Sequence, residues 1–135
     1  MNSKQFLQFG GTVLVLLGIL GFVGVIGPTA DKSVFGDAWW FDKGENWAHL
    51  LFGIVALVAA FLFPASTQRP LVMLVGLISL SAAIYNVFTE TLLGTNLESP
   101  ADLILHLFVA AWALWASMKK SGSMMRPPAA PVNPV

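Results

Sequence analysis

The sequence predicts an all-α protein, a four-helix transmembrane bundle made of two similar helical hairpins. The first observation is composition, because 56% of the 135 residues are hydrophobic and only 10% are charged, whereas a soluble domain carries about 25% charged residues. The second is that four apolar runs follow one another along the chain, each close to the length that crosses a hydrocarbon core of roughly 30 Å. The third is a pattern of a capping residue, an acid and a histidine, which occurs twice.

The predicted membrane domain covers residues 1–120, with spans at about 6–26, 47–63, 71–88 and 101–118. The first run is longer than the core of a usual signal peptide, and Pro28 stands where a cleavage site prefers a small residue, so we expect the span to be retained. We expect a tight turn over 65–70 and place Trp39 to Phe41 at the membrane interface. Residues 121–135 are rich in Pro and Ala and are expected to form a disordered cytoplasmic tail.

The basic residues predict the orientation of the four spans. Only Lys32 and Lys43 fall on one side, and five fall on the other: Lys4, Arg69, Lys119, Lys120 and Arg126. Short loops rich in Lys and Arg favour the cytoplasmic side. We therefore expect a multi-pass protein of the bacterial inner membrane, with both termini in the cytoplasm.

The repeated pattern predicts two similar helix starts. The first copy is Asp42, Glu45 and His49, and the second, 57 residues later, is Ser99, Asp102 and His106. A capping residue three positions before an acid marks the start of a helix, and an acid and a histidine four apart share one helix face. A shift of 58 aligns the preceding spans as well, so that small residues match one another: Gly18, Gly21 and Gly24 with Gly76, Ser79 and Ala82.

Several stretches resemble a known family. They are Gly18 to Phe22, the motif Asn-x-x-His-x-x-x-Gly from Asn46 to Gly53, and Asp102 with His106 and Leu107. Over roughly residues 6–117 the chain is similar to small four-span bacterial membrane proteins that are known only as a domain of unknown function. The fourth span departs from a strict repeat, because Ala110 stands where Gly is expected. The resemblance implies the four-span fold and importance for both histidines, and it implies no activity.

Composition and motifs exclude several kinds of function. The formal net charge is zero, which gives no reason to expect a nucleic acid as partner. No cysteine is present, and the sequence contains neither a phosphate-binding loop nor a nucleophile elbow nor a His-Glu-x-x-His motif. We therefore predict a protein that is not an enzyme: a structural or accessory subunit without a cofactor, whose partners are the lipid bilayer and other membrane subunits.

The alternative interpretation is a binding protein. His49 and His106 could be the axial ligands of a haem, or could each bind a chlorophyll-type pigment. Together with Glu45 and Asp102 they could instead hold a divalent metal ion. A proton path is disfavoured, because the inner half of every span, on the cytoplasmic side, lacks ionisable residues.

Three further polar residues near the same ends of the spans are predicted to form a structural cluster that could bond to the histidines: Asn46, Tyr85 and Asn86.

Overall fold

The computed structural model describes residues 1–119, so the tail predicted at 121–135 lies outside the described part. This part of the chain forms four long helices, which are α1 (Ser3–Phe22), α2 (Lys43–Leu62), α3 (Ala65–Asn86) and α4 (Ala101–Met118). Each is long and apolar enough to cross a membrane, by length and composition. The prediction of an all-α protein with four candidate membrane spans is therefore confirmed.

Short elements connect the helices at one end of the bundle. Two 3-10 turns, η1 (Ala30–Lys32) and η2 (Gly36–Ala38), lie between α1 and α2. Between α3 and α4, β1 (Thr91–Leu92) pairs antiparallel with β2 (Thr95–Asn96). Leu93 and Gly94 join these strands with φ of 54° and 85°, as a two-residue hairpin loop requires.

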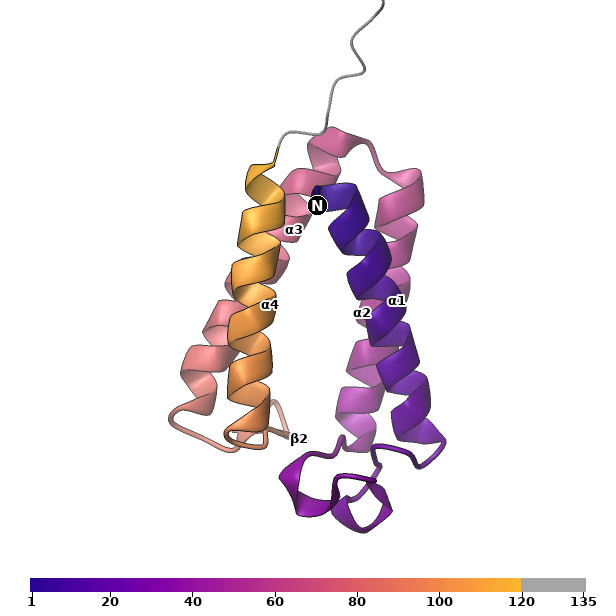
Figure 1. Ribbon diagram of the computed structural model, residues 1–135, viewed down its shortest axis with the longest axis vertical. Helices are drawn as coiled ribbons and strands as arrows, with labels where there is room; N and C mark the ends of the chain where they lie inside the picture. Colours follow the sequence, from indigo (N-terminus) through magenta and orange to yellow (C-terminus); the bar gives the residue numbers. More distant parts are fainter. Residues whose placement is uncertain (120–135) are drawn as a thin grey trace, which may run out of the picture.

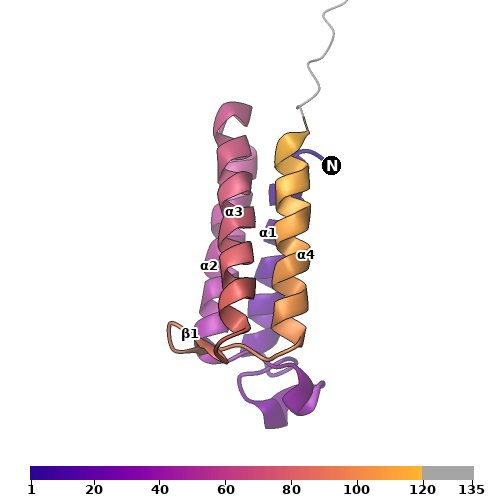
Figure 2. The ribbon, with the colours of Figure 1, turned by 90° about the vertical axis from the view of Figure 1, so that its left-hand side faces the viewer.

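The helices run side by side, and each packs mainly against its neighbour along the chain. Figure 1 shows α1 beside α2 and α3 beside α4, with the N-terminus and the end of α4 at the same end. Figure 2 shows the same helices nearly parallel from the side. The two pairs lie closer together near the N-terminus than at the opposite end, where the connecting loops gather (Figure 1).

Small residues allow α1 and α2 to approach closely. A Cβ atom on Gly11 would lie 3.0 Å from the carbonyl oxygen of Gly53, and one on Gly53 would lie 2.7 Å from the amide nitrogen of Val15. In the second pair, a Cβ atom on Gly76 would lie 2.9 Å from Cγ of Leu114. Membrane helices gain packing energy in this way, because water does not drive them together.

The helix contacts align α1 with α3 at a different shift along the sequence from the one predicted. Gly76 packs against Leu114 of α4. By the 57-residue shift, the matching residue of α2 is Leu57, and Leu57 lies against Gly11, not against Gly18. Equivalent contacts therefore relate α1 to α3 by a shift of 65, two helical turns away from the predicted 58. The sequence alignment paired small residues, which recur at more than one register along a membrane helix.

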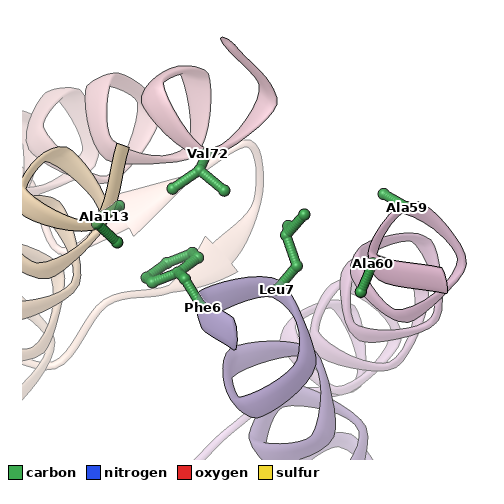
Figure 3. Close-up of a cluster of buried hydrophobic side chains, with 7 residues drawn as sticks. Phe6, Leu7, Ala59, Ala60, Val72 and Ala113 are labelled. Carbon is green, nitrogen blue, oxygen red and sulfur yellow. The ribbon is translucent and has the colours of Figure 1, made fainter. Parts of the chain in front are cut away.

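The apolar core lies at the end of the bundle near the N-terminus. Figure 3 shows Phe6 and Leu7 of α1 pointing into the space between the other helices. The ring of Phe6 also makes an edge contact with Trp112, with centroids 4.7 Å apart. Five small or β-branched residues complete the cluster: Ala59, Ala60, Val72, Ala113 and Ala116. All four helices meet here, so the core holds the two pairs together.

Two helix boundaries differ from the predicted spans. The tight turn expected over 65–70 is the beginning of α3, and Pro70 lies inside that helix. The side chain of Gln68 folds back onto the end of α2, where Nε2 donates to the carbonyl oxygens of Ala59, Ala60 and Phe63. The helix α1 runs over Ser3–Phe22 and is followed by Gly24 with φ of 83°, so it ends before residue 26.

Candidate functional site at the loop end

The two histidines occupy matching places near the starts of α2 and α4. Nδ1 of His49 lies 2.8 Å from the carbonyl oxygen of Glu45, and Nδ1 of His106 lies 2.7 Å from that of Asp102. A carbonyl oxygen only accepts hydrogen bonds, so Nδ1 carries the proton in both rings. In a neutral imidazole the lone pair is then on Nε2. Both rings are fixed in the tautomer that presents Nε2 as a ligand.

Both histidines belong to stripes that face the middle of the bundle. On α2, His49 shares its face with Ala59, and on α4 His106 shares its face with Ala113 and Ala116. These alanines belong to the apolar core near the N-terminus. Both histidines are half-buried, and each lies in the second turn of its helix.

The predicted helix start is confirmed in α2. The amide N–H of Glu45 donates to Oδ1 of Asp42 at 2.8 Å, and the amide N–H of Asp42 donates to Oε2 of Glu45 at 3.0 Å. This is the reciprocal capping box that the spacing predicts. It ties the Glu45 side chain to the backbone at the start of the helix.

The matching prediction for α4 is wrong, because Ser99 does not cap this helix and no side chain does. Asp102 is only 1% exposed and uses its two oxygens elsewhere. Oδ2 accepts from the amide N–H of Glu98 at 2.8 Å, and Oδ1 accepts from Nε1–H of Trp39 at 3.1 Å. The indole comes from the loop between α1 and α2, so a partner distant in sequence replaces the local one.

Hydrogen bonds between the loops join the two helix pairs. Trp39 reaches Asp102, as described, and the amide N–H of Asn96 donates to Oδ2 of Asp42 at 2.9 Å. The amide N–H of Trp40 lies 3.5 Å from Oε2 of Glu98. Nδ2 of Asn96 donates to the other oxygen of the same carboxyl. We call this set the loop clasp: Trp39, Trp40, Asp42, Asn96, Glu98 and Asp102.

Glu98 is a residue of the loop clasp that lies outside the spans, and its surroundings shift the pKa of its carboxyl. Its pKa is raised to about 7, mainly by burial and also by the neighbouring carboxylates of Asp102 and Asp42, while the Trp40 amide N–H acts in the opposite direction. The clasp therefore includes an acid that binds a proton near neutral pH.

An aromatic ring covers His49, which sequence reasoning did not predict. Phe41 stacks on the imidazole with centroids 4.6 Å apart and an angle of 26° between the rings. Phe41 is 1% exposed and makes an edge contact with Trp39 at 5.0 Å. The placement of Trp39 to Phe41 at the membrane interface therefore needs correction, because Phe41 packs inside the protein. Only its nearness in sequence to His49 could have indicated this contact.

The three residues of the predicted structural polar cluster do not come together. Asn46 is fully buried against Gly21, with no hydrogen-bond partner for its amide among the described residues. Nδ2 of Asn86 donates to the carbonyl oxygen of Leu97 at 3.3 Å. Tyr85 is exposed. Within residues 1–119 none of these three side chains bonds to a histidine.

The described residues give the four-ligand metal site no support. Within residues 1–119 no group of three or more His, Asp or Glu side chains is arranged to hold a metal ion. Both oxygens of Asp102 and one of Glu45 accept hydrogen bonds from backbone or indole N–H groups. Both histidines keep Nε2 available as a ligand atom, so a ligand that needs two imidazoles remains to be considered.

No protein family, curated protein or solved structure matches the chain. The resemblance to the four-span family of unknown function stays a prediction.

Proposed function

We propose that this protein binds a haem between its two helix pairs, with Nε2 of His49 and of His106 as the axial ligands. The observation that carries the proposal is that both rings make the same kind of hydrogen bond. Each donates Nδ1–H to the carbonyl oxygen four residues earlier on its own helix. A bond of this kind orients an imidazole and raises its basicity towards a metal.

The surroundings of the pair are consistent with an apolar macrocycle. Phe52 and Val109 are the next residues on the two central stripes. Phe52 is 67% exposed, so the other described side chains leave most of its ring uncovered. A haem needs only two protein ligands, whereas a bare divalent cation needs more donors than the described residues assemble.

The carboxylates have a structural role in this proposal. Asp42, Glu45 and Asp102 accept hydrogen bonds that fix the helix starts and join the loops. They hold the two histidines at matching depth without contacting the haem. In this proposal the pattern of cap, acid and histidine occurs twice because each of the two hairpins supplies one ligand.

The location proposed for the site follows from the charges on the loops. With both termini in the cytoplasm of a bacterial cell, the loop clasp and the histidines lie towards the outer face of the inner membrane. The haem is then held near that face, beneath the loops.

The first test is an absorption spectrum of the full chain, purified in detergent from cells supplied with a haem precursor. We expect a Soret band that shifts on reduction and is lost in the His49→Ala/His106→Ala double variant. The chain has only two histidines, so no other imidazole can replace them. Tyr85→Phe is the control and should keep the spectrum. A colourless wild-type protein, folded and purified from the same cells, would reject the proposal.

The structural or accessory-subunit role is the second candidate, and it is supported by the use of the carboxylates in helix starts and loop contacts. It predicts that another membrane protein accompanies the chain through mild purification. Purification as a lone monomer from its native membrane counts against this role.

A further inference from the structure

We propose that the loop end of α3 binds one phospholipid whose head group carries a primary ammonium. The head group occupies a polar cavity at the end of the helix, and an acyl chain occupies a neighbouring apolar cavity. The inference depends on the four candidate spans lying in a membrane, and it is independent of the haem site. Neither His49 nor His106 lines either cavity.

The polar cavity is open and has a volume of about 560 Å³, and it is lined by residues 86–91 and by Ser99. Asn86 belongs to this lining although it is only 4% exposed. Its Oδ1 has no hydrogen-bond partner among the described residues. A buried acceptor is costly to leave unpaired, and a donor group supplied by a ligand in the cavity would pair it.

The charges around this cavity favour a cationic group. Among the described residues that line it, Glu90 is the one ionisable side chain, and none is Lys or Arg. The C-terminal end of α3 adds the partial negative charge of the helix macrodipole. A primary ammonium has three N–H donors, which suit the Glu90 carboxylate and Oδ1 of Asn86. The hydroxyls of Thr91 and Ser99 are donors for the phosphate of the same head group.

The apolar cavity has a volume of about 410 Å³ and lies between the last turns of α3 and the turn of the β1–β2 hairpin. Its lining is mostly apolar and includes Ile78, Leu92 and Leu93. Leu93 is 99% exposed, which is unfavourable in water. An acyl chain in this cavity would cover these side chains.

The two cavities are neighbours, and the polarity changes where the candidate span ends. Tyr85 lines the apolar cavity and Asn86 lines the polar one. Leu92 and Thr91 are divided in the same way. The candidate span of α3 ends at Asn86, so the apolar cavity lies beside the span and the polar cavity lies beyond it. A phospholipid has the same order, because its head group lies outside the hydrocarbon core.

The test is native mass spectrometry of the full chain. The protein is released from detergent micelles that hold equal amounts of phosphatidylethanolamine, phosphatidylcholine and phosphatidylglycerol with the same acyl chains. We expect the first lipid to be retained about three- to tenfold more than either other lipid, since a charge-assisted hydrogen bond at an open site contributes a modest free energy. Choline has no N–H donor, and phosphatidylglycerol has no ammonium. Equal retention of all three lipids would overturn the proposal.

Glu90→Gln tests the head-group cavity. It should reduce the preference over phosphatidylcholine to less than about twofold, because the charge-assisted bond is lost. Glu90→Lys should instead favour phosphatidylglycerol. Asp37→Asn changes an exposed carboxyl in the other loop at the same end and is the matched control, which should keep the preference. Glu90 and Asp37 are both exposed, so neither change should alter the fold. The same preference in Glu90→Gln and Asp37→Asn would place the head group elsewhere.

Ser81→Phe tests the apolar cavity, which Ser81 lines. Filling it should reduce lipid retention about threefold or more, because apolar contact area is lost. Thr12→Phe is the matched control and should retain lipid as the wild type does. Both residues are exposed, and both hydroxyls donate to the carbonyl oxygen four residues earlier, at 2.9 Å and 2.8 Å.

Soluble phosphoethanolamine separates the head group from the whole lipid. At the concentration of the lipid it should displace little phosphatidylethanolamine, because it cannot fill the apolar cavity. Displacement as effective as that by the lipid itself would reject a lipid as the ligand. All of these measurements use protein without haem, so their outcome is separate from that of the histidine site.

Discussion

Asn46 and Gly21 form a contact that depends on the missing side chain of glycine. A Cβ atom at Gly21 would overlap the amide group of Asn46, which is fully buried between α1 and α2. We therefore expect Gly21→Ala to lower the free energy of unfolding by about 1–3 kcal/mol, the usual cost of overpacking. Reversible unfolding in mixed detergent micelles, followed by circular dichroism, measures it.

Two variants make this prediction specific. Gly10→Ala lies in the same helix with no atom within 4 Å of the new Cβ, so it should be neutral or stabilise by up to about 1 kcal/mol through helix propensity. Asn46→Ala should restore most of the stability lost in Gly21→Ala, because it removes the overlapping group. Equal effects of Gly21→Ala and Gly10→Ala would contradict the contact.

Glu98 gives the loop clasp a dependence on pH. Burial raises the pKa of its carboxyl from 4.5 to about 7 in the folded chain, so the folded state binds this proton more tightly than the unfolded state. The resulting stabilisation is complete below pH 4.5 and is lost as the pH rises through about 7. We expect the Tm of the wild type, relative to that of Glu98→Gln, to fall over this range.

The control for this titration is Glu90→Gln, which changes an exposed carboxyl in the same loop. Thermal scans at several pH values should give Glu90→Gln the same profile as the wild type. A Glu98→Gln profile parallel to that of the wild type would show that the carboxyl of Glu98 is not perturbed.

Local spacing at the level of residues was a good guide where both partners lie within one helical turn. The bonds between Asp42 and Glu45 follow from three-residue spacing and were predicted. The bond from Trp39 to Asp102 joins residues 63 positions apart, and nothing in either local sequence indicates it. The pattern predicts Asp102 as one half of a cap with Ser99, whereas its carboxylate accepts from the nearby Glu98 amide and from a distant indole.

At the scale of elements, Gln68 connects α2 to α3. Its amide donates to three carbonyl oxygens at the end of α2, with distances of 3.2, 3.1 and 2.9 Å. These acceptors lie at a helix end inside an apolar environment, where an unpaired carbonyl is costly. We expect Gln68→Leu to destabilise the protein by about 1–3 kcal/mol in the unfolding titration.

Gln68→Glu should be at least as damaging, because an ionised carboxylate cannot donate to a carbonyl oxygen. Gln8→Leu, at a half-exposed position of α1, is the matched control and should change stability little. If Gln68→Leu behaves like Gln8→Leu, the three bonds do not hold the end of α2.

The four helices were predictable as elements because apolar runs of this length have one main interpretation. Their ends were less so. A turn between Pro64 and Pro70 was expected, yet α3 begins at Ala65 and continues through Pro70, and the side chain of Gln68 donates to carbonyl oxygens at the end of α2. The true boundary depends on contacts between two helices, which hydropathy does not report.

For the whole molecule, the orientation in the membrane can be tested with introduced cysteines, since the chain has none. Lys32→Cys lies in the loop between α1 and α2, and Ser66→Cys lies at the opposite end, both exposed. In intact cells we expect a membrane-impermeant maleimide to label Lys32→Cys and to label Ser66→Cys only after lysis. The reverse pattern would place the histidines towards the cytoplasm.

The candidate site was only partly predictable at this scale. The histidine pair and its depth follow from the repeated pattern. The way the loops cross between the two helix pairs, and the stacking of Phe41 on His49, depend on tertiary contacts between distant segments. The register of α1 against α2 could not be predicted either, because several glycines of α1 could pack against α2 equally well.

The core around Phe6, Leu7 and Val72 has an electrical consequence. Every member of this cluster is apolar, although the buried polar residues Ser3, Gln68 and Ser117 lie at the same end. A proton or hydrated ion entering from the loops finds no carrier among these side chains. In a membrane, this cluster would oppose the movement of ions along the axis of the bundle. Any charge that reaches the level of the histidines is exchanged with one face of the membrane only.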